Sequence, residues 1–195
     1  GWFGFNGGSA LAANADAGMA ILVTHISASV ASLVWIVIEW LRFGKPSLVG
    51  VVTGAIAGLA SITPASGFVG PLGAVLIGLI SGYVCYEAVG LVKNKFKVDD
   101  SLDVFAVHGL GGTLGILLLP FLISESFGGV GYGDGTFSDL MTAQIIGVLA
   151  VLVFTLIVSY ILARISKQIV GIRVTDDEIE RGLDVSSHGQ SGYKL

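Results

Sequence analysis

A single histidine, His108, lies inside an apolar segment that runs from Ser101 to Ile123. As a helix this segment is long enough to cross a hydrocarbon layer of about 30 Å, and Ser101 is placed to cap its start. At about 1.5 Å per residue, His108 then lies on the order of 10 Å below the membrane interface. Ionisable groups are rare at this depth and usually mark a substrate path or a proton relay.

The helical neighbours of His108 are small. Steps of three and four residues along a helix lead from it to Gly111, Gly112 and Gly115. A face without side chains allows another helix to approach closely. Two interpretations follow: a histidine held against a neighbouring helix by close packing, or a histidine that lines a polar path through the membrane. The depth of His108 favours the path.

A second group of candidates is aromatic and polar and comprises Trp2, Phe3, Phe5, Asn6 and Ser9. Aromatic faces attract a cation by about 0.5 to 2 kcal/mol, and a serine hydroxyl accepts a hydrogen bond from an N–H donor. Ammonium offers such donors and potassium offers none. The alternative is structural, with the aromatic residues forming a belt at the membrane interface and Ser9 acting as an end cap.

The sequence lacks the usual parts of several enzyme classes. HExxH, GxSxG, GxxxxGK and paired-cysteine motifs are absent, and Cys85 is the single cysteine. A membrane enzyme that uses His108 with Asp103 is disfavoured, because residues five apart lie about 140° apart around an α-helix. We therefore expect no enzyme activity, no cofactor or metal, and no nucleic-acid partner.

The composition is that of an integral membrane protein. Hydrophobic residues make up 53% of the chain, charged residues make up 12%, and the mean hydropathy is +0.86. Soluble domains carry about 25% charged residues. We predict an all-α bundle with five complete spans after a partial helix in residues 1–10. The spans are Gly18–Leu41, Leu48–Ile62, Gly70–Val92, Ser101–Ile123 and Leu140–Ile165.

The second span is short, but its glycines at positions 50, 54 and 58 form two GxxxG steps, so we predict that it lies hidden within the bundle. His25, in the first span, is expected to be a core histidine. Residues 1–165 are then the transmembrane region and residues 166–195 a tail. Within the tail, Thr175 and Glu178 form a capping-box pattern for a short helix that ends near Gly182.

The distribution of basic residues predicts the topology. The loops at residues 63–69 and 124–139 contain neither Lys nor Arg. All ten basic residues fall in the alternate loops and the tail: Arg42, Lys45, Lys93, Lys95, Lys97, Arg164, Lys167, Arg173, Arg181 and Lys194. By the positive-inside rule the C-terminus is cytoplasmic, and residues 1–10 end a preceding helix at the external face.

Several motifs resemble the ammonium transporter family (Amt/Mep/Rh) in order and along the whole chain. They are GWFGFNGGSA at residues 1–10, GKPSL at 44–48, GAIAGLASITPASG at 54–67, DVFAVHG at 103–109 and GLDVSSHG at 182–189. The resemblance implies ammonium or ammonia as the substrate, a homotrimer with one pore per subunit, and eleven membrane helices arranged as two inverted repeats plus a final helix. It places the protein in the cell membrane.

The resemblance also implies roles for particular residues. Phe5 would be one of two stacked aromatic residues at the external mouth, and Ser9 part of the external ammonium site. His108 would be one of two pore histidines, Trp2 and Thr63 would lie near the path, and Asp103 would lie toward its cytoplasmic end. The tail would contact PII signalling proteins, with His188 as a surface or regulatory residue.

The resemblance covers the second half of the family sequence, and the partner histidine and second gate aromatic are absent from these residues. We therefore expect the chain to be part of a longer or split polypeptide of about twice its mass. The mechanism implied is capture of ammonium outside, deprotonation near Phe5, and passage of ammonia past His108. The alternative is an ammonium sensor that signals through its tail with little flux.

Overall fold

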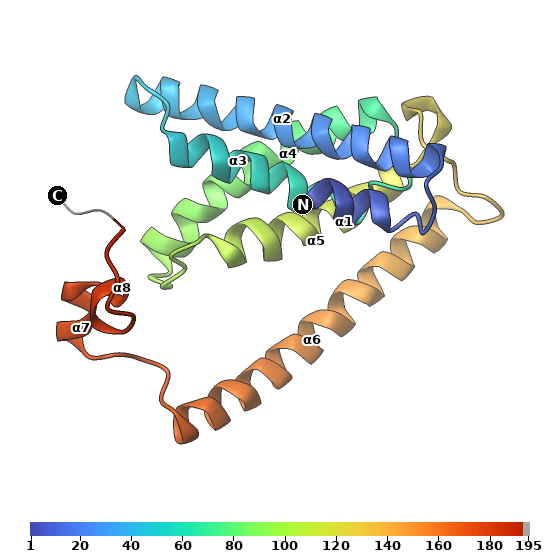
Figure 1. The fold of residues 1–195 in the computed structure, drawn as a ribbon. Helices are drawn as coiled ribbons and strands as arrows, with labels where there is room; N and C mark the ends of the chain where they lie inside the picture. The colour runs from blue at the N-terminus through green and yellow to red at the C-terminus, as the bar shows by residue number, and fades with distance from the viewer. Residues whose placement is uncertain (193–195) are drawn as a thin grey trace. The chain divides into compact units, whose positions relative to one another are not determined.

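The computed structural model describes residues 1–192, in which all regular secondary structure is helical (Figure 1). Lys194, one of the basic residues used above, lies outside the described range. Contacts divide the chain into two compact units, residues 1–148 and a second unit that begins at Leu149. The α-helices are α1 (Trp2–Gly8), α2 (Ala15–Phe43), α3 (Leu48–Ile62), α4 (Pro71–Gly90), α5 (Gly111–Leu122), α6 (Phe137–Ile169), α7 (Asp176–Arg181) and α8 (Leu183–Ser186).

Three shorter helical segments complete the chain. Two are π-helical, η1 (Leu91–Lys95) and η2 (Val104–Leu110), and one is a 3₁₀ turn, η3 (Glu125–Phe127). Because η1 continues α4 and η2 leads into α5, four stretches of the described chain are long and apolar enough to cross a membrane. The helix α3 has the predicted bounds but is shorter, and its crossing stays a prediction.

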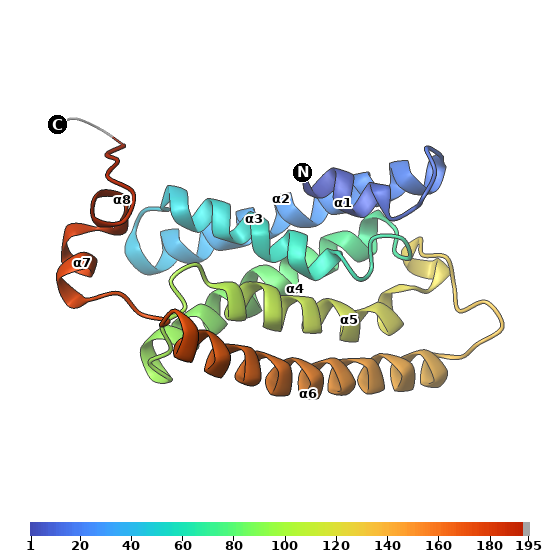
Figure 2. The ribbon, with the colours of Figure 1, turned by 60° about the horizontal axis from the view of Figure 1, so that its bottom comes forward.

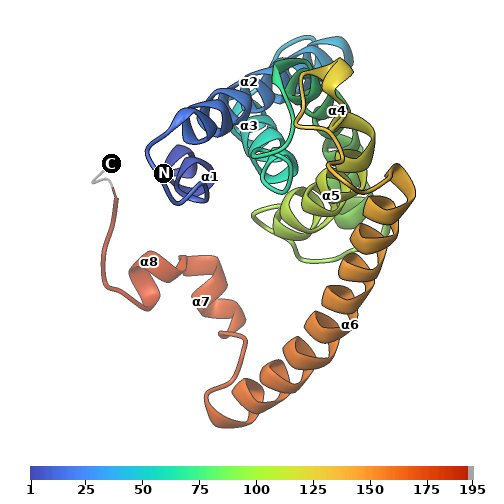
Figure 3. The ribbon, with the colours of Figure 1, turned by 90° about the vertical axis from the view of Figure 1, so that its right-hand side faces the viewer.

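The first unit is a bundle in which α2, α3, α4 and α5 run alongside one another (Figure 2). Figure 3 shows α3 lying among α2, α4 and α5. Its small-residue face is buried against α2, as the GxxxG pattern predicts. A Cβ on Gly54 would lie 2.7 Å from Cβ of Trp35, and a Cβ on Gly58 would lie 2.8 Å from Cα of Ala28. Any side chain at these two positions would push α2 and α3 apart.

Hydrogen bonds from α2 hydroxyls reinforce this close approach. Ser27 Oγ donates to the Gly58 carbonyl at 2.9 Å, and Ser32 Oγ donates to the Val51 carbonyl at 2.9 Å. Such interhelical bonds satisfy polar side chains where the bilayer supplies no water. The seam between α2 and α3 is therefore fixed both by small residues and by polar contacts.

His25 lies outside the buried stripe of α2, so the predicted core histidine is wrong for the described chain. The buried stripe of α2 comprises Ala20, Val23, Thr24, Ser27, Ala31 and Trp35. His25 falls between two of these positions, its side chain is exposed, and its ring meets Phe3 of α1 edge-on at 5.8 Å. Thr24 lies near one edge of the stripe, and His25 is turned about 100° beyond Thr24, away from the buried face.

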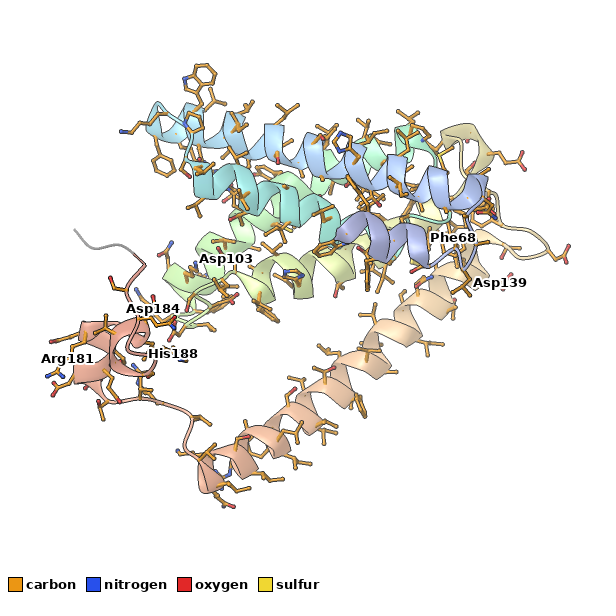
Figure 4. The ribbon with its side chains drawn as sticks, viewed as in Figure 1. Phe68, Asp103, Asp139, Arg181, Asp184 and His188 are labelled. Atoms are coloured by element: carbon orange, nitrogen blue, oxygen red, sulfur yellow. The ribbon has the colours of Figure 1, made fainter. Side chains whose placement is uncertain are left out.

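The largest core cluster lies where α2, α3, α4 and α5 meet the connecting loops. Its buried members are Val23, Ile62, Ala65, Val69, Ala74, Ile77, Leu119, Leu122 and Ile123. The loop at residues 124–136 is fixed to this end. The Tyr132 hydroxyl donates to the Pro120 carbonyl at 2.7 Å. The amide of Val130 donates at 3.0 Å to the carbonyl of Phe68, which is labelled in Figure 4.

The second unit contains the later part of α6 and the short helices α7 and α8. No residue of α6 is buried within the described chain. The predicted capping box is confirmed, since Thr175 and Glu178 bond to each other's backbone at the start of α7 and the helix ends before Gly182. Ser186 Oγ donates to the Gly182 carbonyl at 3.0 Å, which ties α8 to the preceding turn.

Candidate functional site

The short helix α1 carries the predicted site residues Trp2 and Phe5, ends at the predicted residue Ser9, and is anchored on α2 by a buried polar pair. Asn6 Nδ2 donates to Thr24 Oγ1 at 2.9 Å, and Thr24 Oγ1 donates to the Ala20 carbonyl at 2.6 Å. Beside this pair, a Cβ on Gly7 would lie 2.8 Å from the Ile21 side chain. Because both partners of the bond are buried, it fixes the rotation of α1 about its own axis.

Trp2, at the start of α1, connects three predicted residues. Its indole Nε1 donates to Thr63 Oγ1 at 2.8 Å, and its ring lies nearly parallel to the His108 imidazole at a centroid distance of 5.9 Å and an interplanar angle of 20°. Its other ring neighbour is Phe5, edge-on at 6.3 Å. The fold therefore brings Trp2, Phe5, Thr63 and His108 together from α1, the end of α3 and η2.

Ser9, the C-cap residue of α1, lies one helical turn after Phe5. Phe5 is 63% exposed, which leaves most of its ring free of contacts in the described chain. Ser9 is exposed, and its hydroxyl donates to the Phe5 carbonyl at 2.9 Å. A hydroxyl that donates its single proton in this way keeps oxygen lone pairs that can accept a bond from an N–H group.

His108 lies in the π-helix η2 rather than in a regular α-helix, and its side chain is exposed. The predicted cap at Ser101 is wrong. Asp100 accepts hydrogen bonds from the amides of Val104 at 2.8 Å and Phe105 at 2.9 Å. A carboxylate at this position also complements the positive end of the helix dipole, which a serine hydroxyl does less well.

The glycines that follow His108 divide between two environments. A Cβ on Gly111 would lie 3.0 Å from Ser61 Oγ and 3.1 Å from Cys85 Sγ, and a Cβ on Gly115 would collide with the backbone of Ser61. The predicted close neighbour is thus α3. A Cβ on Gly112 would meet open space, so small residues serve packing on one side of α5 and leave the other side free.

Asp103, labelled in Figure 4, is the residue directly before η2. It has a φ of 57°, and its carboxylate is 2.7 Å from Lys93 Nζ. Because η2 is π-helical, the angle of about 140° expected between Asp103 and His108 on an α-helix does not apply. This carboxylate nevertheless forms an ion pair with Lys93, which joins η1 to the start of η2.

A cavity of about 380 Å³ adjoins Asp103. It is bordered by the ends of α2, α3 and α4, where Arg42 forms an ion pair with Glu87 and lies 5.0 Å from the Tyr86 ring centre. Glu39 accepts hydrogen bonds from the amide and the hydroxyl of Ser47. The lining of this cavity includes none of Trp2, Phe5, Thr63 and His108.

The tail residues of the predicted partner site lie in α7, α8 and the turn that follows. Arg181, Asp184 and His188 are labelled in Figure 4, and all three are exposed. The amide of Gln190 donates to the Asp184 carbonyl at 2.8 Å, which folds the chain back after α8.

These features define a multi-pass helical membrane protein in which aromatic rings, a threonine and an exposed histidine gather on one side of the bundle. The model of the Ammonium Transporter Family matches residues 1–193. The chain belongs to this family.

Two relatives show how far the similarity extends. Ammonium transporter Amt1 of Archaeoglobus fulgidus is 46% identical over 196 residues, which cover 99% of this chain and 49% of that protein. An ammonium transporter of Bacillus subtilis is 41% identical over 197 residues, covering 100% of this chain and 48% of that protein. The chain thus spans about half the length of these relatives.

Solved structures show the same fold. A structure named "Sensor Amt Protein" matches with a TM-score of 0.84 and 31% identity, over 95% of this chain and 45% of that one. The Mep2 protein of Saccharomyces cerevisiae matches with a TM-score of 0.79 and 34% identity, over 90% of this chain and 41% of that one.

Sequence reasoning missed two features of the site. Asn6 was considered only as a polar candidate, and its partner Thr24 was not considered, although a threonine inside an apolar helix is a signal for an interhelical hydrogen bond. Asp100 was missed because the adjacent Ser101 is itself a common N-cap residue, and the sequence does not show which of the two reaches the first amides.

Proposed function

We propose that this protein moves ammonium across the membrane along a path bordered by Phe5, Trp2 and His108. The observation that carries the proposal is the arrangement of these residues. An exposed imidazole on a membrane bundle stacks on an indole ring, and the indole ring contacts an exposed phenylalanine. The membership of the chain in a family of ammonium transporters supports the same substrate.

The physical problem that such a path solves is desolvation. Carrying a charged ion through an apolar pore costs at least several kcal/mol, and neutral ammonia costs far less. In the proposed sequence ammonium is recruited outside, gives a proton to water at the external mouth near Phe5, and passes His108 as ammonia.

Ser9 and the aromatic residues would provide the recruitment step. The Ser9 oxygen retains lone pairs for an N–H donor, because its own proton is given to the Phe5 carbonyl. The ring of Phe5 adds the attraction of an aromatic face for a cation. Potassium carries the same charge but has no N–H group, so it cannot form this hydrogen bond.

The orientation and assembly are further proposals. Residues 1–165 form the transmembrane region of a cell-membrane protein, and the tail at residues 166–195 is cytoplasmic, as the distribution of Lys and Arg predicts. Asp103 then lies toward the cytoplasmic end of the path. We also propose a homotrimer and a PII signalling protein as a partner of the tail.

Uptake of labelled methylammonium into proteoliposomes that contain the complete protein tests the proposal. We expect saturable accumulation that ammonium inhibits and that an excess of potassium leaves unchanged. Equal inhibition by potassium, or accumulation no greater than in protein-free liposomes, would contradict it.

An ammonium sensor with little flux is the second candidate. It is favoured by the match to the structure named "Sensor Amt Protein". A sensor should bind methylammonium without accumulating it, so equilibrium binding measured beside the uptake separates the two functions.

A further inference from the structure

The contacts of Trp2 suggest a role that differs from that of a simple lining residue. One indole ring contacts Thr63 through its N–H, His108 through its face and Phe5 through an edge-to-face contact. These three residues come from segments far apart in the sequence. The ring is half-buried, whereas the imidazole that it supports is exposed.

Thr63 is occupied by structural bonds. Its hydroxyl donates its proton to the Leu59 carbonyl at 2.7 Å and accepts the Trp2 N–H at 2.8 Å. A threonine hydroxyl has one proton to give. The hydroxyl thus has no proton left for a substrate, and its position is set by the last turn of α3.

The hydrogen bond to Thr63 and the edge-to-face contact with Phe5 together restrict the plane of the indole ring, and the indole ring restricts the plane of the imidazole. Two rings at 5.9 Å and 20° are nearly parallel, so a rotation of the imidazole about its side-chain bonds would break the contact. The directions in which the two ring nitrogens of His108 point follow from that plane, and a relay or a path for ammonia depends on these directions.

We propose that Trp2 and Thr63 form a clamp that orients the His108 ring, and that Thr63 acts on transport only through Trp2. In this scheme Trp2 and Thr63 are positioning residues, and Thr63 makes no contact with the substrate. The proposal rests on the proposed function for its transport consequence, but the orientation of His108 is a structural property that can be measured separately.

The transport test uses the complete protein in proteoliposomes. Thr63→Val keeps the shape of the side chain and removes the acceptor, and Trp2→Phe keeps a ring for stacking and removes the N–H. We expect each variant to lower the maximal rate of methylammonium uptake about fivefold to tenfold, with less than a twofold change in the concentration for half-maximal uptake. Thr63→Ser restores the hydroxyl and should recover most of the rate.

The double variant distinguishes the clamp from independent roles. If Thr63 acts only through Trp2, the variant with both substitutions should be no slower than the slower single variant. Losses that multiply would show that the two residues act separately, and a wild-type rate for Thr63→Val would show that the hydroxyl is dispensable. Either result would overturn the clamp.

A structural measurement covers the case in which the wild-type protein accumulates no methylammonium. A cryo-electron microscopy structure of the Thr63→Val variant should show the imidazole of His108 turned away from its nearly parallel position against Trp2. An unchanged ring in that variant would refute the clamp, whatever the transport assay shows. A failure of wild-type uptake with a turned ring would refute the proposed function alone.

Discussion

Replacing Asp100 with alanine should release the start of η2, the helix that carries His108. The Asp100 carboxylate accepts the amides of Val104 and Phe105 at 2.8 and 2.9 Å, and that of Ala106 at a longer 3.4 Å. In the described chain these bonds satisfy the first amides of a π-helix whose N-cap residue has a left-handed backbone and provides no side-chain cap. A helix start without such partners has unsatisfied N–H groups.

The expected cost follows from the exposure of those amides. A hydrogen bond to a charged group contributes about 1.5 to 3 kcal/mol, which would give an upper sum of about 6 for the two short bonds. Val104 and Phe105 are exposed, however, so water can replace much of what is lost. The loss should therefore be close to that of an ordinary N-cap, about 1 to 2 kcal/mol.

Reversible unfolding of the purified protein in mixed micelles provides the measurement. The matched control is Asp99→Ala, because Asp99 is an adjacent exposed carboxylate whose contact is a 3.4 Å bond from Ser101. We expect less than about 0.5 kcal/mol for the control, as is usual for an exposed substitution. Equal costs for the two variants would refute the assignment of the cap.

Three further predictions concern packing, anchoring and the tail. Gly115→Ala should destabilise the protein by about 1 to 3 kcal/mol, because its Cβ would meet the backbone of α3, whereas Gly112→Ala on the same helix faces open space and should be neutral or stabilising in the same unfolding assay. Asn6→Leu should cost about 1 to 3 kcal/mol by leaving the buried Thr24 hydroxyl without its donor, and Thr24→Val in that background should add little if the two act as a pair. Bonds from the backbone and side chain of its capping partner lower the pKa of Glu178 below its ordinary 4.5. The Glu178 carboxylate therefore stabilises α7 above pH 4.5, and this stabilisation is lost as the pH falls through the lowered pKa. Hydrogen exchange of the α7 amides, corrected for intrinsic rates, should show protection that falls with pH in this way. In the Glu178→Gln variant the protection should not depend on pH.

The helices could be predicted well because hydropathy and capping are local properties. The bounds of α3 follow from the apolar run Leu48–Ile62, and in the structure Ser47 caps the helix by accepting the Gly50 amide. The capping box at Thr175 is likewise readable over four residues. The burial of the GxxxG face could be predicted because three glycines at four-residue spacing form a bare face on one side of a helix, and such a face allows a neighbouring helix to approach closely.

The site was harder to predict because its contacts join distant segments. Trp2 and Thr63 are 61 residues apart, and the pattern of neither segment indicates their bond. The π-helical winding of η2 was missed because hydrophobic periodicity cannot separate it from an α-helix over seven residues. His25 was misassigned because an isolated histidine in an apolar run does not reveal which face of the helix it occupies.

If His108 borders a path selective for ammonium, replacing this residue should change the selectivity between cations. Methylammonium uptake and potassium flux are measured in proteoliposomes with the complete protein, with His108→Ala compared against His25→Ala as a second exposed histidine in the same bundle. We expect the preference for ammonium over potassium to fall at least about tenfold, or about 1.4 kcal/mol, in the His108 variant and to stay unchanged in the His25 variant. Unaltered discrimination in the His108 variant would show that His108 does not border the selective path.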